Sequence, residues 1–249
     1  MIDTIHLQNS DFMVEEKAGI KIIPGIINNK TGKKGEWTLF YPISRGGSKP
    51  ITGKKAFFKG EKVYAVIFHK PYDCISLLRV EFSAPRILRL NNFQLVEKEE
   101  IATVFQLVEK ELREGGIHCD LFNSKVNRLD LSKNFIVKEN PDFYLQALSE
   151  NIEKARLIKT NYLKTFYLTN KQQEICIYDK IKEMKTKKVD TSNYPHNVLR
   201  IEWRLLKNKK IKAVLGIETG KELIEYYTFM KSCFFTALQK NIFYLNLKV

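Results

Sequence analysis

The stretch Glu174-Ile175-Cys176-Ile177-Tyr178-Asp179-Lys180-Ile181-Lys182-Glu183 decides the fold, because its first half alternates between polar and apolar residues. Such alternation predicts a half-buried β-strand, on which side chains repeat every second residue. Cys176, Tyr178 and Lys180 then share one face, opposite the isoleucines. A tyrosine beside a lysine is a candidate nucleophile next to a cation. For this stretch alone, a tyrosine that merely faces solvent is the simpler interpretation.

Two further stretches alternate in the same way, Val126-Asn127-Arg128-Leu129-Asp130-Leu131 and Val198-Leu199-Arg200-Ile201-Glu202-Trp203-Arg204-Leu205. The polar faces of these stretches carry Arg128 and Asp130, and then Arg200, Glu202 and Arg204. If all three strands lie in one sheet with these faces on the same side, Asp130, Glu202 and Tyr178 converge. Carboxylates that hold a divalent cation, together with a tyrosine and several cations, suit phosphodiester chemistry. Three amphipathic strands with ordinary solvated charges are the alternative.

The composition favours a polyanionic partner. The chain has 249 residues, of which 44% are hydrophobic, enough for one large domain or one domain plus an appendage. Its formal net charge of +14 favours nucleic acid first and an anionic membrane second, with a lysine-rich proteome as the alternative explanation. No apolar run is long enough to span a membrane, and no signal segment follows Met1. The four scattered cysteines show no zinc spacing and are expected to be reduced.

The order of strands and helices predicts an α+β fold, with a central, largely antiparallel sheet and helices packed on it. The expected strands include residues 1–8, 37–41, 63–69 and 75–82, and a hairpin joins 162–169 to 174–178. Helices are expected at 97–114, 142–158 and 219–239. A polar, lysine-rich connection is expected at 184–195.

Apolar periodicity assigns buried residues to the two later helices. The helix at 142–158 is expected to bury Phe143 or Tyr144, Leu148, Ile152 and Ala155. The helix at 219–239 is expected to be apolar at Leu223, Tyr226, Tyr227, Met230, Phe234 and Leu238.

Four motifs and the chain start carry a resemblance to a known family. They are Met1-Ile2-Asp3, Ser83-Ala84-Pro85-Arg86-Ile87-Leu88 with Asn91-Asn92, Val126-Asn127-Arg128-Leu129-Asp130, Ile177-Tyr178-Asp179-Lys180-Ile181-Lys182-Glu183 and Leu199-Arg200-Ile201-Glu202-Trp203-Arg204-Leu205. In this order they resemble the gene II/X replication proteins of filamentous phages and their plasmid and prophage relatives. The resemblance covers roughly residues 1–215.

The resemblance implies a rolling-circle replication initiator, a site-specific nickase that joins its tyrosine to the cut DNA strand. Tyr178 matches the nucleophilic tyrosine of that family, and Lys180 and Glu183 match the residues after it. Asp130 and Glu202 match the acidic positions of the other two motifs. Residues 1–215 would form the nicking and DNA-binding domain, and 216–249 a C-terminal helical appendage.

The resemblance also points to the histidine-hydrophobe-histidine nuclease superfamily, from which this sequence departs. His6, His69, His118 and His196 are all isolated. Carboxylates must therefore carry the metal ion, which suits Mg²⁺ or Mn²⁺. We expect Asp130 and Glu202 to bind it, and Glu183 to be either a third ligand or an exposed residue at a helix start.

Several cations are candidates for the reaction and for DNA binding. Lys180 is expected to favour the phenolate form of Tyr178. The candidate phosphate contacts are Arg128, Arg200, Lys182, Lys185, Lys187, Lys188, Lys207, Lys209, Lys210 and Lys212. Arg204 is instead expected to form a structural salt bridge. The expected partners are origin DNA and a host helicase and polymerase in a bacterial cytoplasm.

Two other functions and three other tyrosines compete with this interpretation. A copy-number regulator that binds DNA without chemistry explains the charge equally well, and a plasmid-mobilisation relaxase shares the chemistry. Tyr162, Tyr167 and Tyr194 are the rival nucleophiles. Among them Tyr167 is expected on the strand next to that of Tyr178.

Overall fold

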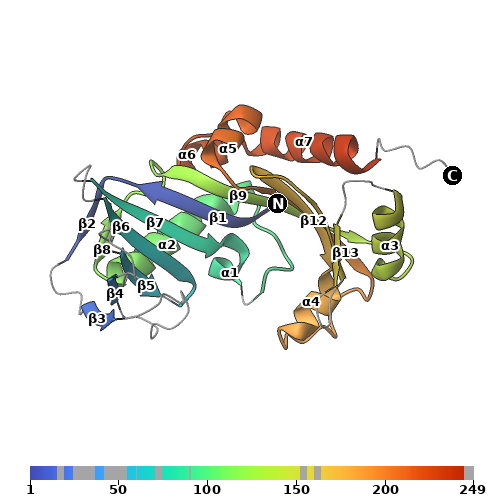
Figure 1. The fold of residues 1–249 in the computed structure, drawn as a ribbon, viewed down its shortest axis with the longest axis horizontal. Coiled ribbons are helices and arrows are strands. Elements are labelled where there is room, and N and C mark those ends of the chain that lie inside the picture. Colours follow the sequence, from blue (N-terminus) through green and yellow to red (C-terminus); the bar gives the residue numbers. More distant parts are fainter. Residues whose placement is uncertain are drawn as a thin grey trace, which may run out of the picture.

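A computed structural model describes residues 1–15, 20–24, 37–41, 55–59, 61–70, 75–89, 91–151, 156–159 and 164–243. In this part of the chain one large curved sheet is flanked by helices, and the N-terminus lies near the middle of the sheet (Figure 1). The fold is α+β with a central, largely antiparallel sheet, as predicted.

Eleven described strands form the sheet in the order β10-β11-β12-β13-β9-β1-β7-β6-β5-β4-β3. Their bounds are β1 Ile2–Asn9, β3 Ile20–Pro24, β4 Trp37–Tyr41, β5 Lys55–Lys59, β6 Val63–Lys70, β7 Ile75–Ser83, β9 Lys125–Ile136, β10 Arg156–Lys159, β11 Lys164–Thr169, β12 Gln173–Asp179 and β13 Val198–Leu205. Strands β3 and β4 pair in parallel, and the other neighbours pair antiparallel. A separate antiparallel pair joins β2 (Phe12–Val14) to β8 (Ile117–Cys119).

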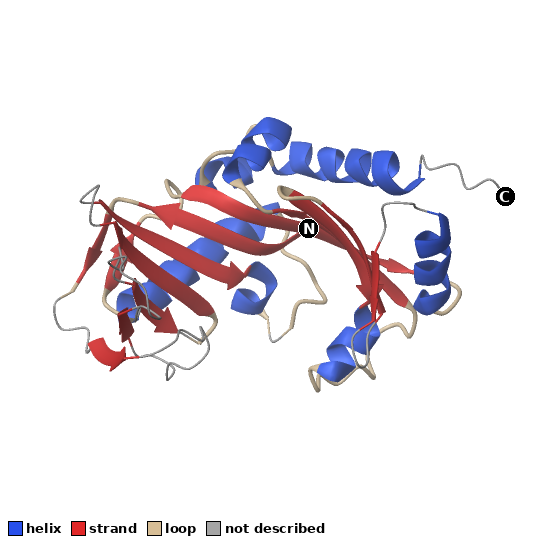
Figure 2. Cartoon of the chain, viewed as in Figure 1, coloured by secondary structure: helices blue, strands red, loops and turns tan. Residues whose placement is uncertain are grey.

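Helices pack mainly on one side of this sheet. Their bounds are α1 Ala84–Leu88, α2 Ile101–Glu114, α3 Pro141–Asn151, α4 Lys180–Thr186, α5 Asn208–Leu215, α6 Gly220–Glu225 and α7 Tyr227–Leu238, with single turns at Lys98–Glu100 and Gln239–Phe243. Figure 2 shows α2 behind the strands and α5 to α7 along the upper edge. None of the helices in the described ranges is both long and apolar enough to cross a bilayer.

The alternation of the central strands explains this arrangement. On β9, Leu129 and Leu131 are fully buried and contribute to the core. On α2, Val104 and Phe105 enter the same core, as Ile211 of α5 does. Each such side chain contributes about 1.5–3 kcal/mol when fully buried. The apolar face is therefore covered by helices, and the polar face of the same strands is left for the candidate site.

The predicted helix at 97–114 is confirmed. A capping box between Glu97 and Glu100 begins it, since each residue's carboxylate accepts a hydrogen bond from the other's backbone N–H. The buried stripe of α2 follows the predicted spacing. The chain leaves the helix at Gly115 and Gly116, where Gly116 has a φ of 77°, a conformation that favours glycine.

The predicted helix at 142–158 is wrong in its second half. Helix α3 ends at Asn151, and 156–159 is strand β10, which pairs Leu157 with Phe166 of β11. A short apolar run fits a strand as well as a helix. Here it forms a strand, because it pairs with the edge of β11 that β12 does not occupy. Leu145 is the fully buried apolar side chain of α3, whereas Phe143 is 68% exposed. Tyr144 and Leu148 are partly buried against the core, and Ile152 and Ala155 lie outside the described residues.

Two further expectations need correction. The connection expected at 184–195 begins inside α4, whose N-cap Asp179 accepts a hydrogen bond from the backbone N–H of Lys182 at 3.0 Å. The single helix expected at 219–239 is two helices, α6 and α7, with a turn at Tyr226. That tyrosine is 45% exposed rather than buried, while the other apolar positions predicted for these helices are in the core.

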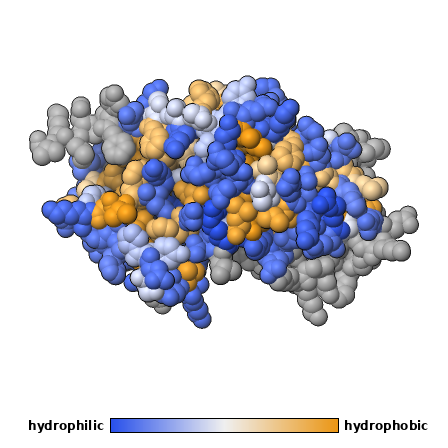
Figure 3. Space-filling model, turned by 180° about the vertical axis from the view of Figure 1, so that it is seen from behind, coloured by the Kyte–Doolittle hydropathy of each residue, from blue (hydrophilic) through white to orange (hydrophobic). Residues whose placement is uncertain are grey.

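The surface seen from behind mixes hydrophilic side chains with apolar patches (Figure 3). The exposed large apolar residues of the described chain are Met13, Leu107, Ile136, Phe143, Tyr226 and Phe229. They come from different elements, and single exposed apolar side chains of this kind are ordinary on protein surfaces. Cys119, Cys176 and Cys233 carry free thiols, as expected, and Cys74 lies outside the described residues.

Candidate active site

The three polar strand faces predicted from the sequence lie side by side. Strand β13 pairs with β12 on one edge and with β9 on the other. The register sets Tyr178 opposite Arg200, and Arg204 opposite Asp130. The structure thus brings Tyr178, Asp130 and Glu202 to the wall of one cavity of about 420 Å³.

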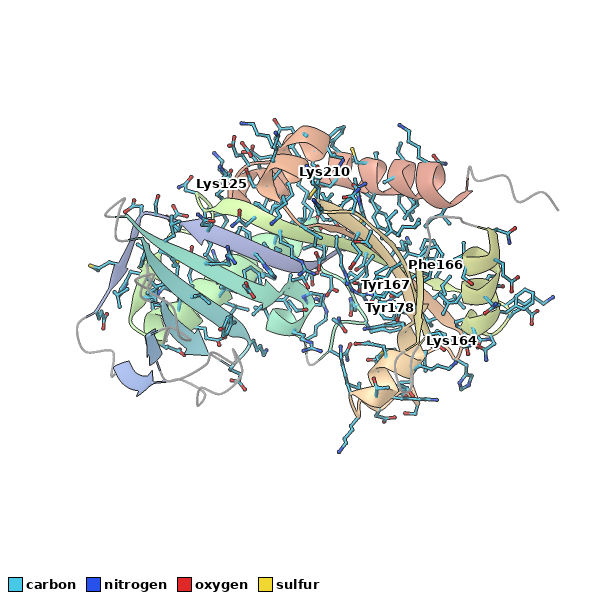
Figure 4. All side chains as sticks on the ribbon, viewed as in Figure 1. Lys125, Lys164, Phe166, Tyr167, Tyr178 and Lys210 are labelled. Carbon is cyan, nitrogen blue, oxygen red and sulfur yellow. The ribbon has the colours of Figure 1, made fainter. Side chains whose placement is uncertain are left out.

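This cavity lies on the polar face where β12, β13, β9 and β1 meet. Its lining residues are Asp3, Thr4, Ser83, Arg86, Asn92, Arg128, Asp130, Thr165, Tyr167, Cys176, Tyr178, Glu183, Lys187, Glu202 and Arg204. Figure 4 shows Tyr167 and Tyr178 close together on neighbouring strands of this wall. Most of the lining side chains are polar, so the cavity suits a charged or strongly polar ligand.

Tyr178 is buried, with 6% of its surface exposed, and its hydroxyl donates a hydrogen bond to Oε1 of Glu202 at 2.6 Å. Burial raises the pKa of Tyr178 well above its ordinary value. The positive charge of Arg200 opposes this rise, and the negative charge of Glu202 adds to it. The tyrosine is therefore protonated and held in one orientation in the free protein.

Glu202 is the centre of a buried ion-pair network. Arg200 donates from Nε to Oε1 of Glu202 at 3.0 Å, and Arg204 donates from Nε and Nη2 to Oε2 at 2.9 and 2.6 Å. Burial raises the pKa of Glu202, but the two arginines outweigh it and lower the value to about 2. Arg204 also binds Glu174 at 2.7 Å, and so forms the structural salt bridges expected of it.

Asp130 is paired within its own strand. Arg128, two residues earlier on β9, donates from Nε and Nη2 to the two carboxylate oxygens at 2.8 and 2.7 Å. This bidentate geometry is the strong form of the arginine–carboxylate interaction. Burial nevertheless raises the pKa of Asp130 to about 6, with Arg128 opposing the rise. The guanidinium of Arg128, predicted to bind DNA, is thus occupied by this carboxylate.

Lys180 does not lie on the strand face that the alternation predicted. Strand β12 ends at Asp179, and Lys180 is the first residue of α4. Its fully buried ammonium donates to Glu183 Oε2 and to Asn92 Oδ1, both at 2.7 Å. Burial lowers its pKa to about 8. The predicted face shared by Tyr178 and Lys180 is therefore wrong, because a helix begins where the strand was expected to continue.

Glu183 is a buried member of the site rather than an exposed residue at a helix start. Besides Lys180, its carboxylate binds the ammonium of Lys187, one turn along α4. Burial raises the pKa of Glu183, but the two lysines outweigh it and lower the value below its usual range. Glu183 thus anchors α4 beside the cavity.

The carboxylates expected to hold Mg²⁺ or Mn²⁺ are all occupied by cationic side chains. Asp130, Glu202 and Glu183 bind arginine or lysine as described above. In the described ranges, no three His, Cys, Asp or Glu side chains are grouped so that they could hold a metal ion. A divalent cation would have to displace guanidinium or ammonium groups, so this arrangement does not fit the ion. Metal dependence stays a prediction.

Arg200, also predicted to contact DNA, is fully buried. Besides Glu202, it binds Asp3 Oδ2 at 2.9 Å, Ser132 Oγ at 2.8 Å and the backbone carbonyl of Asn92 at 2.7 Å. A guanidinium with this many internal acceptors is a structural link between β13, β9, β1 and the 91–96 segment. In this arrangement it does not reach a DNA phosphate.

The lysines that were predicted to contact DNA form two clusters, one near α4 and one near α5, on different sides of the sheet. Helix α4 is beside the cavity, whereas α5 packs its buried Ile211 and Leu215 on the apolar side, against β9 and β13 (Figure 1). The α5 cluster comprises Lys207, Lys209, Lys210 and Lys212. The α4 lysines are therefore on the side of the cavity, and those of α5 are on the opposite side of the sheet.

The α4 cluster comprises Lys182, Lys185, Lys187 and Lys188, and two of these lysines are paired with carboxylates. Lys182 binds Asp142 at 2.9 Å, and Lys187 binds Glu183. Lys185 and Lys188 are exposed and have no carboxylate partner among the described residues.

Replacing Lys185 and Lys188 by Gln should flatten the salt dependence of binding to single-stranded origin DNA. The slope of log K against log salt should fall by about 1.4, at about 0.7 for each of two phosphates. Fluorescence anisotropy at several salt concentrations measures it. The same exchange at Lys209 and Lys210 should leave this slope unchanged, because α5 is on the other side of the sheet. If the slope did not change in the Lys185/Lys188 variant, these two lysines would be solvated and would not contact DNA phosphates.

The rival tyrosines occupy different environments. Tyr167 lines the same cavity from β11, and burial raises its pKa to about 12. Tyr194 lies in the loop after α4, where its hydroxyl accepts a hydrogen bond from Asn91 Nδ2 at 3.0 Å. Its ring packs on that of Phe93, with 4.5 Å between the two ring centroids. Tyr162 lies outside the described residues.

Among the lining residues that were not predicted from the sequence to belong to the site, three carry a charged or amide side chain. They are Asp3, Arg86 and Asn92. All three fall within motifs that carry the family resemblance, and that position is the one signal the sequence offers for them. Alternation could not orient Asp3, because the pairing of β1 with β9 shifts register next to it.

Comparison with protein-family models gives a match over residues 97–224, to the model of the N-terminal part of the phage gene II replication-associated protein. The matched region contains β12, β13 and β9, and with them Tyr178, Glu202 and Asp130. A comparison with curated proteins gives no match.

Proposed function

Because this chain belongs to the family of phage gene II replication-associated proteins, we propose that it is a replication initiator that nicks one strand of its origin DNA and remains joined to the cut end through Tyr178. The hydrogen bond from Tyr178 to Glu202 carries this proposal, because it fixes the hydroxyl of Tyr178 in a cavity of polar and charged groups. The +14 charge of the chain favours the polyanionic substrate.

The proposed reaction exchanges one phosphate ester for another. The phenolic oxygen of Tyr178 attacks phosphorus, the bond from phosphorus to the 3′ oxygen breaks, and that 3′ oxygen takes up one proton in place of the one that Tyr178 loses. The products are a tyrosine 5′-phosphate and a free 3′-hydroxyl, which a host polymerase can extend while a host helicase separates the strands. The number of phosphate esters is unchanged, so the reverse reaction rejoins the strand without an energy source.

Glu202 is better suited to position the tyrosine than to take its proton. Its pKa of about 2 makes it a weak base, whereas the pKa of Tyr178 is raised by burial. Transfer between groups so far apart in pKa is strongly uphill, since each unit costs about 1.4 kcal/mol. The reactive phenolate therefore forms mainly by loss of the proton to solvent.

This assignment predicts a steep pH dependence. Below the pKa of a tyrosine, the phenolate fraction rises about tenfold per pH unit. The rate of covalent adduct formation under single-turnover conditions should thus approach a tenfold rise per unit between pH 7 and pH 9. Quenched time courses on denaturing gels, with saturating DNA at every pH, measure it. A flat profile would mean that a group of the protein takes the proton during attack.

Mass spectrometry of the protein after reaction with single-stranded or supercoiled origin DNA tests the function itself. After nuclease digestion, the peptide that contains Tyr178 should carry a covalently bound nucleotide. Nicking without any adduct, or an adduct on another residue, would contradict the proposal. Binding without cleavage would favour a non-catalytic DNA-binding protein.

A further inference from the structure

The cations that line the cavity differ in whether they have an acidic partner. Three of them are bound to carboxylates: Arg128 to Asp130, Lys187 to Glu183, and Arg204 to Glu202 and Glu174. The fourth, Arg86, is exposed and has no hydrogen bond or ion pair with any residue in the described ranges. Arg86 thus keeps its full charge and its donors available at the edge of the cavity.

The backbone beneath Arg86 is firmly held. Helix α1 buries Ala84, Pro85 and Ile87 in the protein. Proline near the start of a helix fixes the backbone in a helical conformation, and the Pro85 carbonyl accepts a hydrogen bond from the Arg89 N–H at 2.8 Å. The arginine therefore projects from a fixed base, although its own side chain is exposed.

The other charges of the cavity explain why an unpaired cation matters. Its lining carboxylates are Asp3, Asp130, Glu183 and Glu202. A DNA phosphate that enters the cavity is repelled by these groups unless a cation that is not already neutralised meets it. Arg86 meets this requirement, because the other lining cations are paired within the protein.

We infer that Arg86 binds the phosphate that Tyr178 attacks, donating two hydrogen bonds from its guanidinium to the non-bridging oxygens. This inference rests on the proposed nicking function and names the group that holds the reacting phosphate. Arginine matches phosphate with a planar pair of donors, and its charge stabilises the negative charge that grows on those oxygens during attack.

The first test compares rates of adduct formation at saturating DNA. Arg86→Gln should lower the rate roughly ten- to a hundredfold, which is the range expected when hydrogen bonds to a charged group are lost. Arg86→Lys should recover part of the rate, since it restores the charge but not the paired donors. Arg113→Gln is the matched control, because Arg113 is also an exposed arginine in the last turn of a helix, α2, and does not line the cavity.

The second test asks whether Arg86 acts on the reacting phosphate in particular. In the Tyr178→Phe background, which prevents cleavage, binding is measured to two oligonucleotides. One carries a natural phosphate at the mapped cleavage position, and the other an uncharged methylphosphonate. The methylphosphonate should weaken binding roughly tenfold or more when Arg86 is present and by much less in Arg86→Gln.

The outcomes separate this inference from the proposed function. Reaction of the wild-type protein with undiminished reaction of Arg86→Gln would overturn the role of Arg86 and leave the nicking function standing. Equal effects of the methylphosphonate with and without Arg86 would overturn it too. If the wild-type protein formed no adduct with any origin DNA, both proposals would fail.

Discussion

Tyr178→Phe should abolish covalent attachment to DNA and leave DNA binding intact. The exchange removes one hydroxyl and keeps the ring, which packs in the wall of the cavity. Glu202 loses the hydrogen bond from the tyrosine but keeps those from Arg200 and Arg204, so its charge stays compensated. Denaturing gels should show no shifted protein, while anisotropy should give an affinity for origin DNA within a few-fold of wild type.

Tyr167→Phe is the matched control for this result. It removes the same group from the neighbouring strand of the same cavity. We expect it to retain both binding and attachment, because Glu202 is hydrogen bonded to Tyr178. An adduct that persists in Tyr178→Phe would reject Tyr178 as the nucleophile. If Tyr167→Phe nicks but does not rejoin the displaced strand, a cycle with two tyrosines would replace the single-tyrosine one.

Alternation alone predicted the wall of the site. The period of two in β12, β9 and β13 placed Tyr178, Asp130 and Glu202 on one polar surface, and the strand pairing agrees. The prediction worked because the opposite faces must be buried, which fixes the register of each strand. The same logic identified α2, whose apolar stripe is continuous over its whole length.

The partners of each charge could not be predicted in this way. Nothing in the sequence shows that Arg128 and Arg204 turn onto carboxylates within their own strands, two residues away. The end of β12 could not be predicted either, because Asp179 is compatible with a strand but here caps α4. That single helix start moves Lys180 away from the tyrosine and gives Glu183 its buried position. Local capping thus overrode an alternation that continued in the sequence.

Glu202→Ala should strongly destabilise the protein. The carboxylate of Glu202 is the centre of a buried ion-pair network, so we do not expect the alanine variant to keep the stability of the wild-type fold. Its removal leaves Arg200, which is fully buried, and Arg204 without their shared carboxylate. Breaking a buried ion pair from one side costs about 3–5 kcal/mol, and the loss here should lie near the lower end of that range, because Arg200 keeps Asp3 and Arg204 keeps Glu174 as partners. The midpoint of urea unfolding, at an unchanged slope, measures the loss.

Two variants show whether this loss comes from buried charge. Glu202→Gln keeps the shape and an oxygen that accepts from Tyr178, so it should be more stable than the alanine variant while still less stable than wild type. Glu174→Ala removes the other carboxylate partner of Arg204. Because Glu174 is partly exposed, this exchange should lower the free energy of unfolding by only about 1 kcal/mol or less. If Glu202→Ala unfolded at the wild-type midpoint, the two arginines would not depend on Glu202. Any loss of nicking in that variant would then report on Tyr178 alone, whose hydroxyl would no longer have its acceptor.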